Sequence, residues 1–500
     1  MQEFDDLLHR WNEVGYIKEV NGSLLTVDGL PSVKMNEIVL LESGEIAQVF
    51  SLQKEKFTIL LFSPHSIAIG TRVVRTGEPL KVDVGSFLLG SCIDSLAQPI
   101  ISSLKPSNSE KRPIDVRPQG IAHRQKITQP FVSGVSIVDM LIPLGKGQRE
   151  LIIGDRKTGK TSFLLQTVLT QTKTNTVCIY AMIAKQQNEI NSLLAYLKDN
   201  NISEQTVVVA SSRHDPEGLI YLTPYTAMTI AEYFRDQGQD VLVILDDLTT
   251  HAKAYRTISL MAKRFPGRSS YPANIFYTHA RLLERAGNFK HDGKASAITC
   301  LPVAETTNGD LSGYIQTNLM SMTDGHIFFD VNLYASGRRP PINSFLSVSR
   351  VGRQTQTPLG QSIAREVNSF LTLLEKSEKY SHFGAEATLN IKDTLSFGSK
   401  IIAFFNQPTD VTLPQSLQIF VFALLWARYF QTLSIPEQEA KVEAIRKLYF
   451  SNKEIRTFID EAISNADSLN HLLNALNSQD EKIKKFFSVS QPVITPSNKL

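Results

Sequence analysis

The segment GDRKTGKT, Gly154 to Thr161, has the residue types and spacing of a phosphate-binding loop. A short apolar segment, ELIIG, precedes it, and an amphipathic segment of helical character follows from Ser162. In a strand, loop and helix order, backbone N–H groups at the helix start point at phosphate oxygens, and the helix dipole favours their charge. The spacing therefore predicts a site for the phosphates of a nucleotide. The residues assigned to it are Gly154, Asp155, Arg156, Lys157, Thr158, Gly159, Lys160, Thr161 and Ser162.

Two of these loop residues and one distant acid are expected to bind the phosphates and a magnesium ion. Lys160 should reach the outer phosphates, and the Thr161 hydroxyl should bind Mg²⁺. A second apolar segment, VLVILDD, ends in Asp246 and Asp247. Two acids after a strand often cap a helix or face a loop, but the upstream loop favours a metal role. We therefore predict that Asp246 orients a Mg²⁺-bound water.

Hydrolysis further requires a group that positions and polarises the attacking water, commonly a carboxylate or a glutamine. In many phosphate-loop ATPases this group lies at the end of the strand next to the loop. Here that segment is VCIYAMIA, and the residue after it is Lys185. An ammonium cannot accept a proton from water, although it could pair with phosphate or with a neighbouring acid. Glu189 follows four residues later, about one turn into a helix, and is a poor substitute. The pattern favours binding without efficient turnover.

The composition of the chain is that of a folded protein with several domains. Its 500 residues are 42% hydrophobic and 20% charged, which exceeds one ordinary domain and excludes a disordered chain. The 52 basic and 49 acidic side chains leave a net charge of +3, which gives no support to a nucleic-acid partner. Three widely spaced cysteines indicate buried thiols in a reducing cytoplasm.

Neither the N-terminal residues nor the strongest apolar run suggests a membrane segment. The first residues, MQEFDDLLHRWNEVG, lack the apolar core of a signal peptide and instead show Phe4, Leu7, Leu8 and Trp11 at helical spacing. The strongest apolar run, IFVFALLWA at 419–427, is far shorter than the roughly 20 residues of a spanning helix. We expect an amphipathic N-terminal helix and a buried core helix in a cytoplasmic protein.

The order of segments predicts a multidomain α/β chain. Residues 1–80 contain short strand-like segments with Asn-Gly and Asp-Gly turns, typical of a small β-barrel. A polar linker, SLKPSNSEKRPIDVRPQG, follows. Within 81–356, apolar strands alternate with helical segments, which indicates a largely parallel sheet with helices on both faces. Residues 357–500 are predicted to form helices, followed by an irregular tail at 488–500.

The arrangement of several motifs resembles the α subunit of the F-type ATP synthase head, in the family's order and over nearly the whole chain. These motifs are GKGQRELIIGDRKTGKTS, EYFRDQG, LVILDDLTTHAKAYRTISL, RFPGRSSYP, FYTHARLLERA, TNLMSMTDGHIFFD and RRPPINSFLSVSRVG. The resemblance implies an alternating 3:3 hexamer with β-type catalytic chains around a γ-like central shaft. In that family the α subunit binds ATP (or ADP) with Mg²⁺ without hydrolysing it. Membrane contact would be indirect, through other subunits at the inner face of the cell membrane.

Individual residues take expected roles from this resemblance. Arg350 matches the arginine finger that reaches into the neighbouring β site, where a planar cation stabilises the charge of the transferring phosphoryl group. Lys185 stands where the α subunit has glutamine and the β subunit glutamate, which strengthens the non-catalytic interpretation. Lys157 replaces another family glutamine; it could add charge near the phosphates or simply face solvent.

The base of the nucleotide is expected near a second set of family positions. Gln407 matches one adenine-side residue, whereas Thr409 replaces a second glutamine there. Arg339 and Pro340 match residues near the same pocket. Typical α subunits also carry further N-terminal residues that dock the peripheral stalk. Divergent copies of this head occur in mycoplasmas, some in specialised motors, and the short N-terminus and Lys185 are compatible with such a copy.

Two other function classes compete with this interpretation. A self-sufficient hexameric RecA-like ATPase, of the flagellar-export or Rho type, would carry its own catalytic glutamate, and Lys185 opposes that. A Rho-like protein would also need exposed basic and aromatic residues for RNA. A purely structural subunit without nucleotide is opposed by the intact loop and by Asp246.

Overall fold

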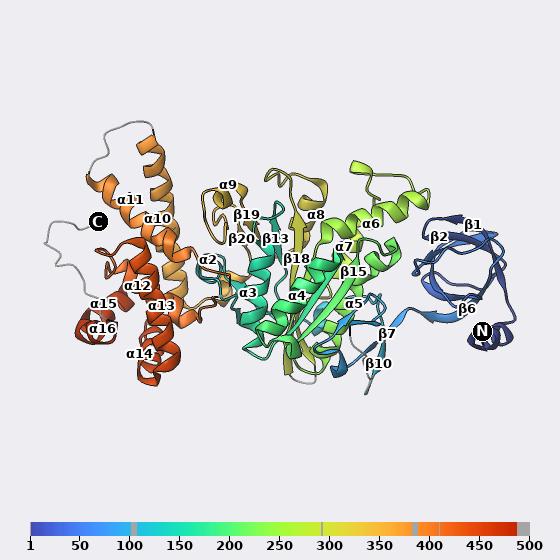
Figure 1. The fold of residues 1–500 in the computed structure, drawn as a ribbon, viewed down its shortest axis with the longest axis horizontal. Coiled ribbons are helices and arrows are strands. Elements are labelled where there is room, and N and C mark those ends of the chain that lie inside the picture. Colours follow the sequence, from blue (N-terminus) through green and yellow to red (C-terminus); the bar gives the residue numbers. More distant parts are fainter. Residues whose placement is uncertain (1, 102–107, 292–293, 383–388, 410, 488–500) are drawn as a thin grey trace. The chain divides into compact units, whose positions relative to one another are not determined.

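The computed structural model describes residues 2–101, 108–291, 294–382, 389–409 and 411–487 (Figure 1). By contacts the chain divides into two compact units. The first contains Met1–Lys126, Lys146–Arg156 and Gln171–His326, and the second contains Ile127–Gly145, Lys157–Thr170 and Ile327–Leu500. The domain boundaries after residues 80 and 356 stay a prediction, and the predicted irregular tail lies outside the described residues.

The N-terminal strands of the first unit close into a barrel in the order β1-β2-β5-β4-β3-β6. Side chains alternate between the interior and the surface, as in β4, where Ala47 and Val49 are buried between more exposed neighbours. Gly22 joins the paired strands β1 and β2 and has a positive φ angle of 58°, as a hairpin turn requires. Gly29, with φ 95°, lies in the connection from β2 to β3, which do not pair, so the hairpin turn predicted at Asp-Gly is wrong. The barrel strands are β1 (Gly15–Asn21), β2 (Leu24–Asp28), β3 (Glu37–Leu41), β4 (Ile46–Leu52), β5 (Lys56–Leu61) and β6 (Arg72–Pro79).

The amphipathic helix predicted at the N-terminus is α1 (Gln2–Trp11). Its Phe4 is buried and packs with Leu40 and Val74 on the outside of the barrel. The Arg75 guanidinium lies 4.5 Å from the centre of the Trp11 ring. The helix thus covers an apolar strip that the barrel strands leave outside their core.

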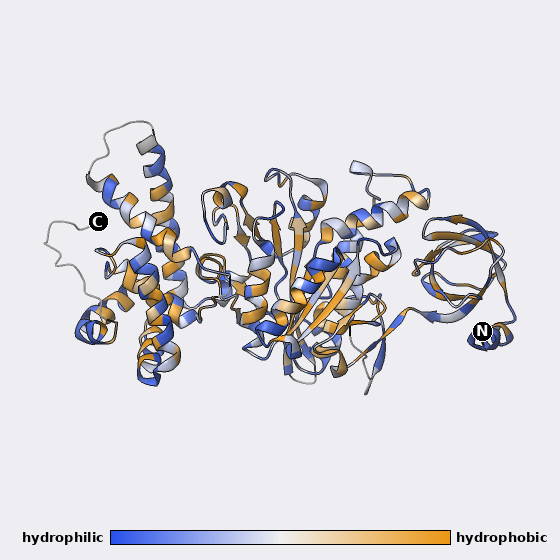
Figure 2. Cartoon of the chain, in the orientation of Figure 1, coloured by the Kyte–Doolittle hydropathy of each residue, from blue (hydrophilic) through white to orange (hydrophobic). Residues whose placement is uncertain are grey.

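The remaining strands of the first unit form a mostly parallel sheet in the order β13-β18-β16-β14-β15-β8-β9, with β17 antiparallel to β18. Helices cover its faces, and the strands are largely apolar along their length (Figures 1 and 2), as expected for strands buried on both sides. Its strands are β8 (Cys92–Ile93), β9 (Pro99–Ile101), β13 (Glu150–Gly154), β14 (Val177–Lys185), β15 (Thr206–Ser212), β16 (Val241–Asp246), β17 (Gly287–His291) and β18 (Lys294–Glu305). The predicted α/β architecture is confirmed.

The helices of this unit follow the strands along the chain. They are η1 (Ser86–Leu88), η2 (Ile121–His123), α4 (Gln187–Asp199), η3 (Ser203–Gln205), α5 (Glu217–Asp236), α6 (Leu248–Met261), η4 (Arg268–Ser270), α7 (Ile275–Leu283) and α8 (Tyr314–Met322). Cys92, Cys178 and Cys300 are free and buried in the sheet.

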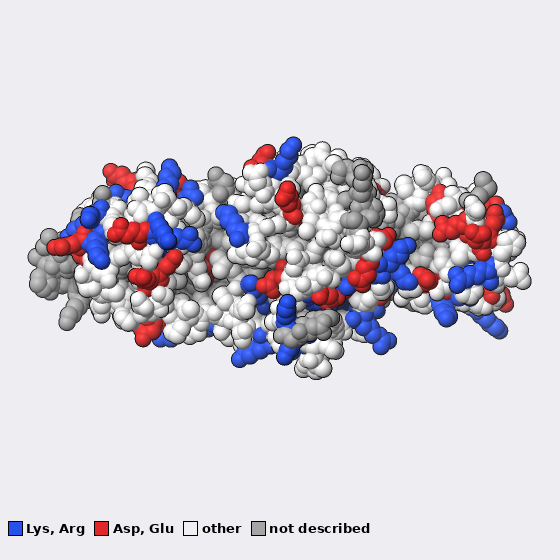
Figure 3. Space-filling model, turned by 90° about the horizontal axis from the view of Figure 1, so that it is seen from below, with Lys and Arg blue, Asp and Glu red and all other residues white. Residues whose placement is uncertain are grey.

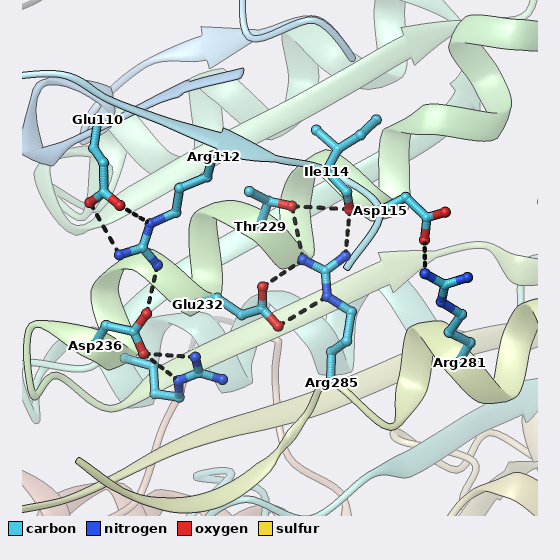
Figure 4. Close-up of polar contacts among 10 residues, drawn as sticks. Glu110, Arg112, Ile114, Asp115, Thr229, Glu232, Asp236, Arg281 and Arg285 are labelled. Atoms are coloured by element: carbon cyan, nitrogen blue, oxygen red, sulfur yellow. Dashed lines mark hydrogen bonds and ion pairs between the residues drawn. The ribbon is translucent and has the colours of Figure 1, made fainter. Parts of the chain in front are cut away.

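Part of the predicted polar linker is a strand. β10 (Glu110–Pro113) pairs antiparallel with β7 (Lys81–Val84). Arg112 on β10 donates to Asp236 Oδ2 at 2.6 Å, and Arg285 donates through Nη1 to the carbonyl oxygen of Ile114 at 2.7 Å (Figure 4). Arg112 thus holds the linker to α5, and Arg285 holds it to the segment that follows α7.

The second unit contains the helices predicted for the C-terminal part of the chain. Its apolar helix α12 has residues 417–425 buried on all sides, which confirms the predicted core helix. Its strands are β11 (Pro130–Phe131), β12 (Leu144–Gly145), β19 (Gly325–Phe329, which begins in the first unit) and β20 (Val348–Ser349). Its helices are α2 (Ser136–Leu141), α3 (Lys160–Thr172, which ends in the first unit), α9 (Val331–Ala335), η5 (Gly352–Thr355), α10 (Pro358–His382), α11 (Leu389–Phe405), α12 (Gln415–Trp426), α13 (Ile435–Ser451), α14 (Lys453–Ser464), α15 (Leu469–Ser478) and α16 (Asp480–Phe487).

Two surface properties bear on the partners of the chain. Basic and acidic side chains are interspersed on the face drawn in Figure 3, in keeping with the small net charge. In the part of the chain that the structure describes, no helix has both the length and the apolar character needed to cross a bilayer.

Candidate functional site

The phosphate loop begins at the end of β13 in the first unit. Asp155 Oδ1 accepts hydrogen bonds from Thr306 Oγ1 and, at 2.9 Å, from the backbone N–H of Gly309. Arg156 donates through Nε to Glu305 Oε2 at 2.8 Å. The Asp155 and Arg156 side chains therefore hold the start of the loop against the end of β18 and the segment that follows it.

The rest of the loop lies in the second unit and leads directly into α3. Gly159 has φ +92°, a left-handed conformation that favours glycine. Lys157 also has a positive φ, 61°, and its side chain is exposed, whereas Thr158 and Lys160 are buried. Thr161 is exposed at the first turn of α3, and Ser162 is half-buried beside it. The helix start predicted for phosphate binding is present.

The residues predicted near the base lie together in the second unit. The backbone N–H of Gln407 donates to the carbonyl oxygen of Arg339 at 2.7 Å. Pro340 follows Arg339, and a Cβ placed on Gly159 would lie 3.8 Å from Pro341 Cδ. The loop end and the Arg339–Pro341 segment are thus neighbours.

The Gln407 side chain has an additional role that the sequence did not indicate. Its Oε1 accepts from the N–H and the hydroxyl of Ser136 at 3.1 and 3.2 Å, and its Nε2 donates to the carbonyl oxygens of Gly134 and Val411 at 2.7 and 2.5 Å. Both amide hydrogens and two acceptor positions are used. A base contact by this amide would have to displace one of these partners.

Lys185 and Asp246 meet at the carboxyl ends of two adjacent strands of the first unit. Lys185 Nζ donates to Asp246 Oδ1 at 2.7 Å and lies 3.6 Å from Asp247 Oδ2. Tyr180 OH donates to the other oxygen, Asp246 Oδ2, at 3.0 Å. Both oxygens of the predicted metal-side carboxylate therefore have protein donors.

The local geometry of β14 explains how Lys185 reaches this acid. Met182, not Lys185, is the register partner of Asp246 between the parallel strands β14 and β16. The pairing of β14 with β15 is irregular between Met182 and Lys185, and Ala184 has φ 51°. An irregularity of this kind redirects the side chains beyond it. The strand end consequently turns the ammonium back over Asp246.

Neighbouring groups decide the protonation states of Lys185 and Tyr180 at this strand end. Burial alone would lower the pKa of Lys185, but the charges of Asp246 and Asp247 outweigh it and raise that pKa above its ordinary value. Burial, together with the charge of Asp246, raises the pKa of Tyr180 well above its ordinary value. Lys185 is thus an ammonium and Tyr180 a neutral phenol near pH 7. Neither can act as a base toward water.

Two further acids near this edge, Asp247 and Glu189, are also engaged. Asp247 is the N-cap of α6, and its Oδ1 accepts from the N–H of Thr250 at 2.6 Å. Glu189 lies in the first turn of α4, where its Oε2 accepts from the N–H of Gln186 at 2.8 Å. The helix-cap alternative applies to Asp247 and not to Asp246. Glu189 closes a capping box and is not placed as a catalytic carboxylate.

The donor set around Asp246 does not fit a carboxylate that holds a metal-bound water. A Mg²⁺ site needs oxygen ligands or waters held by oxygens, but here an ammonium covers one carboxylate oxygen and a phenol the other. Among the described residues, no group of three or more His, Cys, Asp or Glu side chains could hold a metal ion. Thr161 keeps its exposed position at the helix start.

Arg350 lies directly after β20 and lines an open hollow of about 620 Å³ in the second unit. Two further arginines, Arg353 and Arg365, line the same hollow. The remaining lining residues are Gln354, Gln356, Gln361, Ala364 and Asn368. Within the described part of the chain, no acidic side chain pairs with any of these three arginines. The hollow is suited to an anion.

Sequence reasoning missed several of these contributors. Tyr180 could have been found, because a hydroxyl inside a continuous apolar strand must reach a buried partner. Arg353 and Arg365 gave no signal, since isolated surface arginines are common. Glu305, the partner of Arg156, ends an apolar segment and could be assigned only once the strand order was known.

Comparison with known proteins gives consistent matches over most of the chain. Residues 134–349 match the ATP synthase alpha/beta family, nucleotide-binding domain. The protein named ATP synthase subunit alpha 2 of Nitrosospira multiformis is 36% identical over 435 residues, which is 87% of this chain and 85% of the relative. ATP synthase subunit alpha 1 of Psychromonas ingrahamii is 37% identical over 435 residues, 87% and 84% of the two chains. ATP synthase subunit alpha of Staphylococcus aureus is 34% identical over 424 residues, 85% and 84%.

Proposed function

Because the chain belongs to the family of ATP synthase α subunits, we propose that it is a nucleotide-binding but non-catalytic α-type subunit of an F-type or F-type-like rotary ATPase. One observation carries the non-catalytic part. At the strand end where a water-activating carboxylate is required, Lys185 is bound to Asp246 at 2.7 Å. A base is absent there among the described residues, since Glu189 caps its own helix.

The phosphates of ATP or ADP bind at the start of α3. The N–H groups of Gly159 to Thr161 face them there, and the Lys160 ammonium adds charge. The Thr161 hydroxyl is the oxygen that the loop offers to Mg²⁺. The base lies toward the Arg339–Pro341 segment, which neighbours Gly159.

The partners are β-type catalytic subunits in an alternating 3:3 hexamer around a γ-like shaft. Arg350 enters the neighbouring catalytic site as an arginine finger. The arginine-lined hollow supports this, since a finger must lie on an open surface without an acidic partner. The complex is peripheral to the inner face of the cell membrane and contacts it through other subunits.

A self-sufficient hexameric ATPase of the flagellar-export or Rho type is the competing function. It requires a catalytic carboxylate in the same chain, and Lys185 occupies that place. The interspersed charges on the drawn face (Figure 3) also give no support to an RNA-binding surface.

The purified full chain tests the proposal. We expect it to bind ATP in calorimetry and to show no hydrolysis above the buffer blank when no β-type partner is present. Lys160→Ala in the loop is the control and should lose the binding signal. Robust turnover by the pure, monodisperse chain would support the self-sufficient ATPase instead, and a complete lack of ATP binding would support a purely structural subunit.

A further inference from the structure

Four parallel strands bring their carboxyl ends to one edge of the first unit's sheet. In the order β13, β18, β16, β14, these ends are Gly154, Glu305, Asp246 and Lys185. Ligands of open parallel sheets bind outside this edge. The first loop residues are held at the same edge, because Arg156 pairs with Glu305. Lys185 therefore lies at the same edge of the sheet as Gly154, where the phosphate loop begins.

The first acid that follows β16 has its charge met by the protein itself. Asp246 is bound by the Lys185 ammonium and the Tyr180 hydroxyl, and the Lys185 and Asp246 side chains are only 16% and 10% exposed. Asp247 caps α6, where it accepts from the N–H of Thr250, while burial raises its pKa. Asp246 therefore does not need a divalent cation to offset its charge.

From this arrangement we propose that Lys185 replaces Mg²⁺ as the cation at Asp246, so that the chain binds metal-free nucleotide nearly as well as the magnesium complex. The inference rests on the proposed nucleotide-binding function and specifies the form of its ligand. A Mg²⁺ ion normally links phosphate oxygens to waters held by a carboxylate. In this chain the carboxylate is already neutralised by a permanent protein cation, so removal of the metal leaves no uncompensated acid.

The decisive measurement is the Kd of the full chain for ATP, by calorimetry, in buffer with excess Mg²⁺ and in buffer with EDTA. For the wild type we expect the two values to agree within about threefold, a difference of less than 1 kcal/mol. For Lys185→Gln, which leaves Asp246 without its ammonium, we expect the affinity in EDTA to fall by about tenfold or more relative to Mg²⁺. Lys185→Arg keeps a cation and should behave like the wild type.

The matched control is Lys146→Gln. Lys146 also pairs with an aspartate at 2.7 Å, Asp240, but Asp240 precedes β16, at the opposite end of the same strand. Loss of this pair should leave the ratio of the two Kd values unchanged. A general effect of removing a lysine would appear in both variants.

Each remaining outcome decides against the inference in a distinct way. Tenfold weaker wild-type binding in EDTA would overturn the inference while leaving the proposed function standing. Equal metal dependence in the wild type and Lys185→Gln would remove Lys185 as the cause. Absence of ATP binding in both buffers would overturn the proposed function, and the inference with it. If Lys185→Gln does not fold, the wild-type ratio and Lys185→Arg still decide.

Discussion

Gly352 shows how closely the arginine segment is held. It lies two residues after Arg350, at the start of η5, and a Cβ placed on it would be 1.7 Å from the carbonyl oxygen of Pro143. The Ser349 hydroxyl donates to the same oxygen at 2.6 Å. The segment that carries Arg350 is thus packed directly on backbone, and only glycine permits this approach.

Gly352→Ala should therefore destabilise the second unit by about 1–3 kcal/mol, since backbone must move to admit the methyl group. The control is Gly360→Ala in α10, where the new Cβ would be 3.5 Å from its nearest neighbour, Thr357 Oγ1. That change should stabilise by about 0.5–1 kcal/mol, because alanine is the better helix former. Denaturant unfolding of both variants measures the effects. Equal stabilities would show that the Pro143 contact is not maintained in solution.

Arg350→Ala should abolish most ATPase activity of the reconstituted complex. A finger contributes roughly 10³–10⁵ to the rate because its planar cation meets charge that develops only in the transition state. Arg365→Ala removes a cation from the same hollow and is expected to lower kcat less than about tenfold. Steady-state kinetics with Mg-ATP compare the two. A near-normal rate in Arg350→Ala, or equal losses in both, would remove the finger assignment.

At the scale of elements, local sequence patterns predicted the strands, loops and helices that depend mainly on neighbouring residues. The strand ELIIG, the glycine loop and the following helix were all predictable because each depends on neighbouring residues. Helix α5 begins at Glu217 and contains Pro224, a residue that a local pattern would take as the end of a helix. Packing against the sheet outweighs the helix-breaking tendency of that proline.

Pairings between distant segments could not be predicted. β10 lies in a polar linker and becomes a strand only because β7 offers it an edge. Lys185 and Asp246 are 61 residues apart, and the irregular end of β14 decides which acid the ammonium meets. The Gln407 amide matched a family position, but its partners come from residues 134–136 and 411, which no motif connects to it.

The buried side chain of Arg285 joins the segment after α7 to helix α5, and its replacement tests how much this contact stabilises the fold. Its side chain is 1% exposed and makes a bidentate pair with Glu232 at 3.0 and 2.6 Å, with further bonds to Thr229 and Ile114 (Figure 4). Arg285→Met leaves the Glu232 carboxylate buried without its cation, which should cost about 3–5 kcal/mol.

Arg281→Met is the matched control for that change. Arg281 pairs with Asp115 at 3.0 Å, but both side chains are about one-third exposed, so its loss should cost less than about 1 kcal/mol. Denaturant unfolding of the full chain measures both. A loss for Arg285→Met no larger than that for Arg281→Met would contradict the buried-pair argument.

At the scale of the whole molecule, folding removes from water some titratable groups that the net charge does not reveal. His251 on α6 and His279 on α7 are buried, with His251 Nδ1 3.0 Å from His279 Nε2. His251 Nε2 lies 3.1 Å from the carbonyl oxygen of Tyr221, which can only accept. The Nε2 of His251 therefore carries the hydrogen, and its Nδ1 accepts from His279. This relay requires the His251 ring to be neutral, because its Nδ1 must keep a lone pair to accept.

Stability should consequently fall as the pH drops below about 6.5. Burial lowers the pKa of His251 to about 4, and burial together with the neighbouring ring lowers that of His279 well below its ordinary value. Below the pKa of an unfolded histidine, about 6.5, the unfolded chain binds protons that the folded chain excludes. Each ring then removes up to about 1.4 kcal/mol of stability per pH unit, down to its folded pKa.

Buried acids such as Asp139, whose pKa burial raises, act with the opposite sign, so a variant must isolate the histidines. His279→Gln keeps an N–H donor for His251 and should reduce the loss of stability between pH 7 and pH 5 by about 1–2 kcal/mol. His214→Gln, at an exposed ring, should not change it. Unfolding free energies at the two pH values provide the comparison. An identical pH dependence in the wild type and His279→Gln would show that the pair accepts a proton in the folded state.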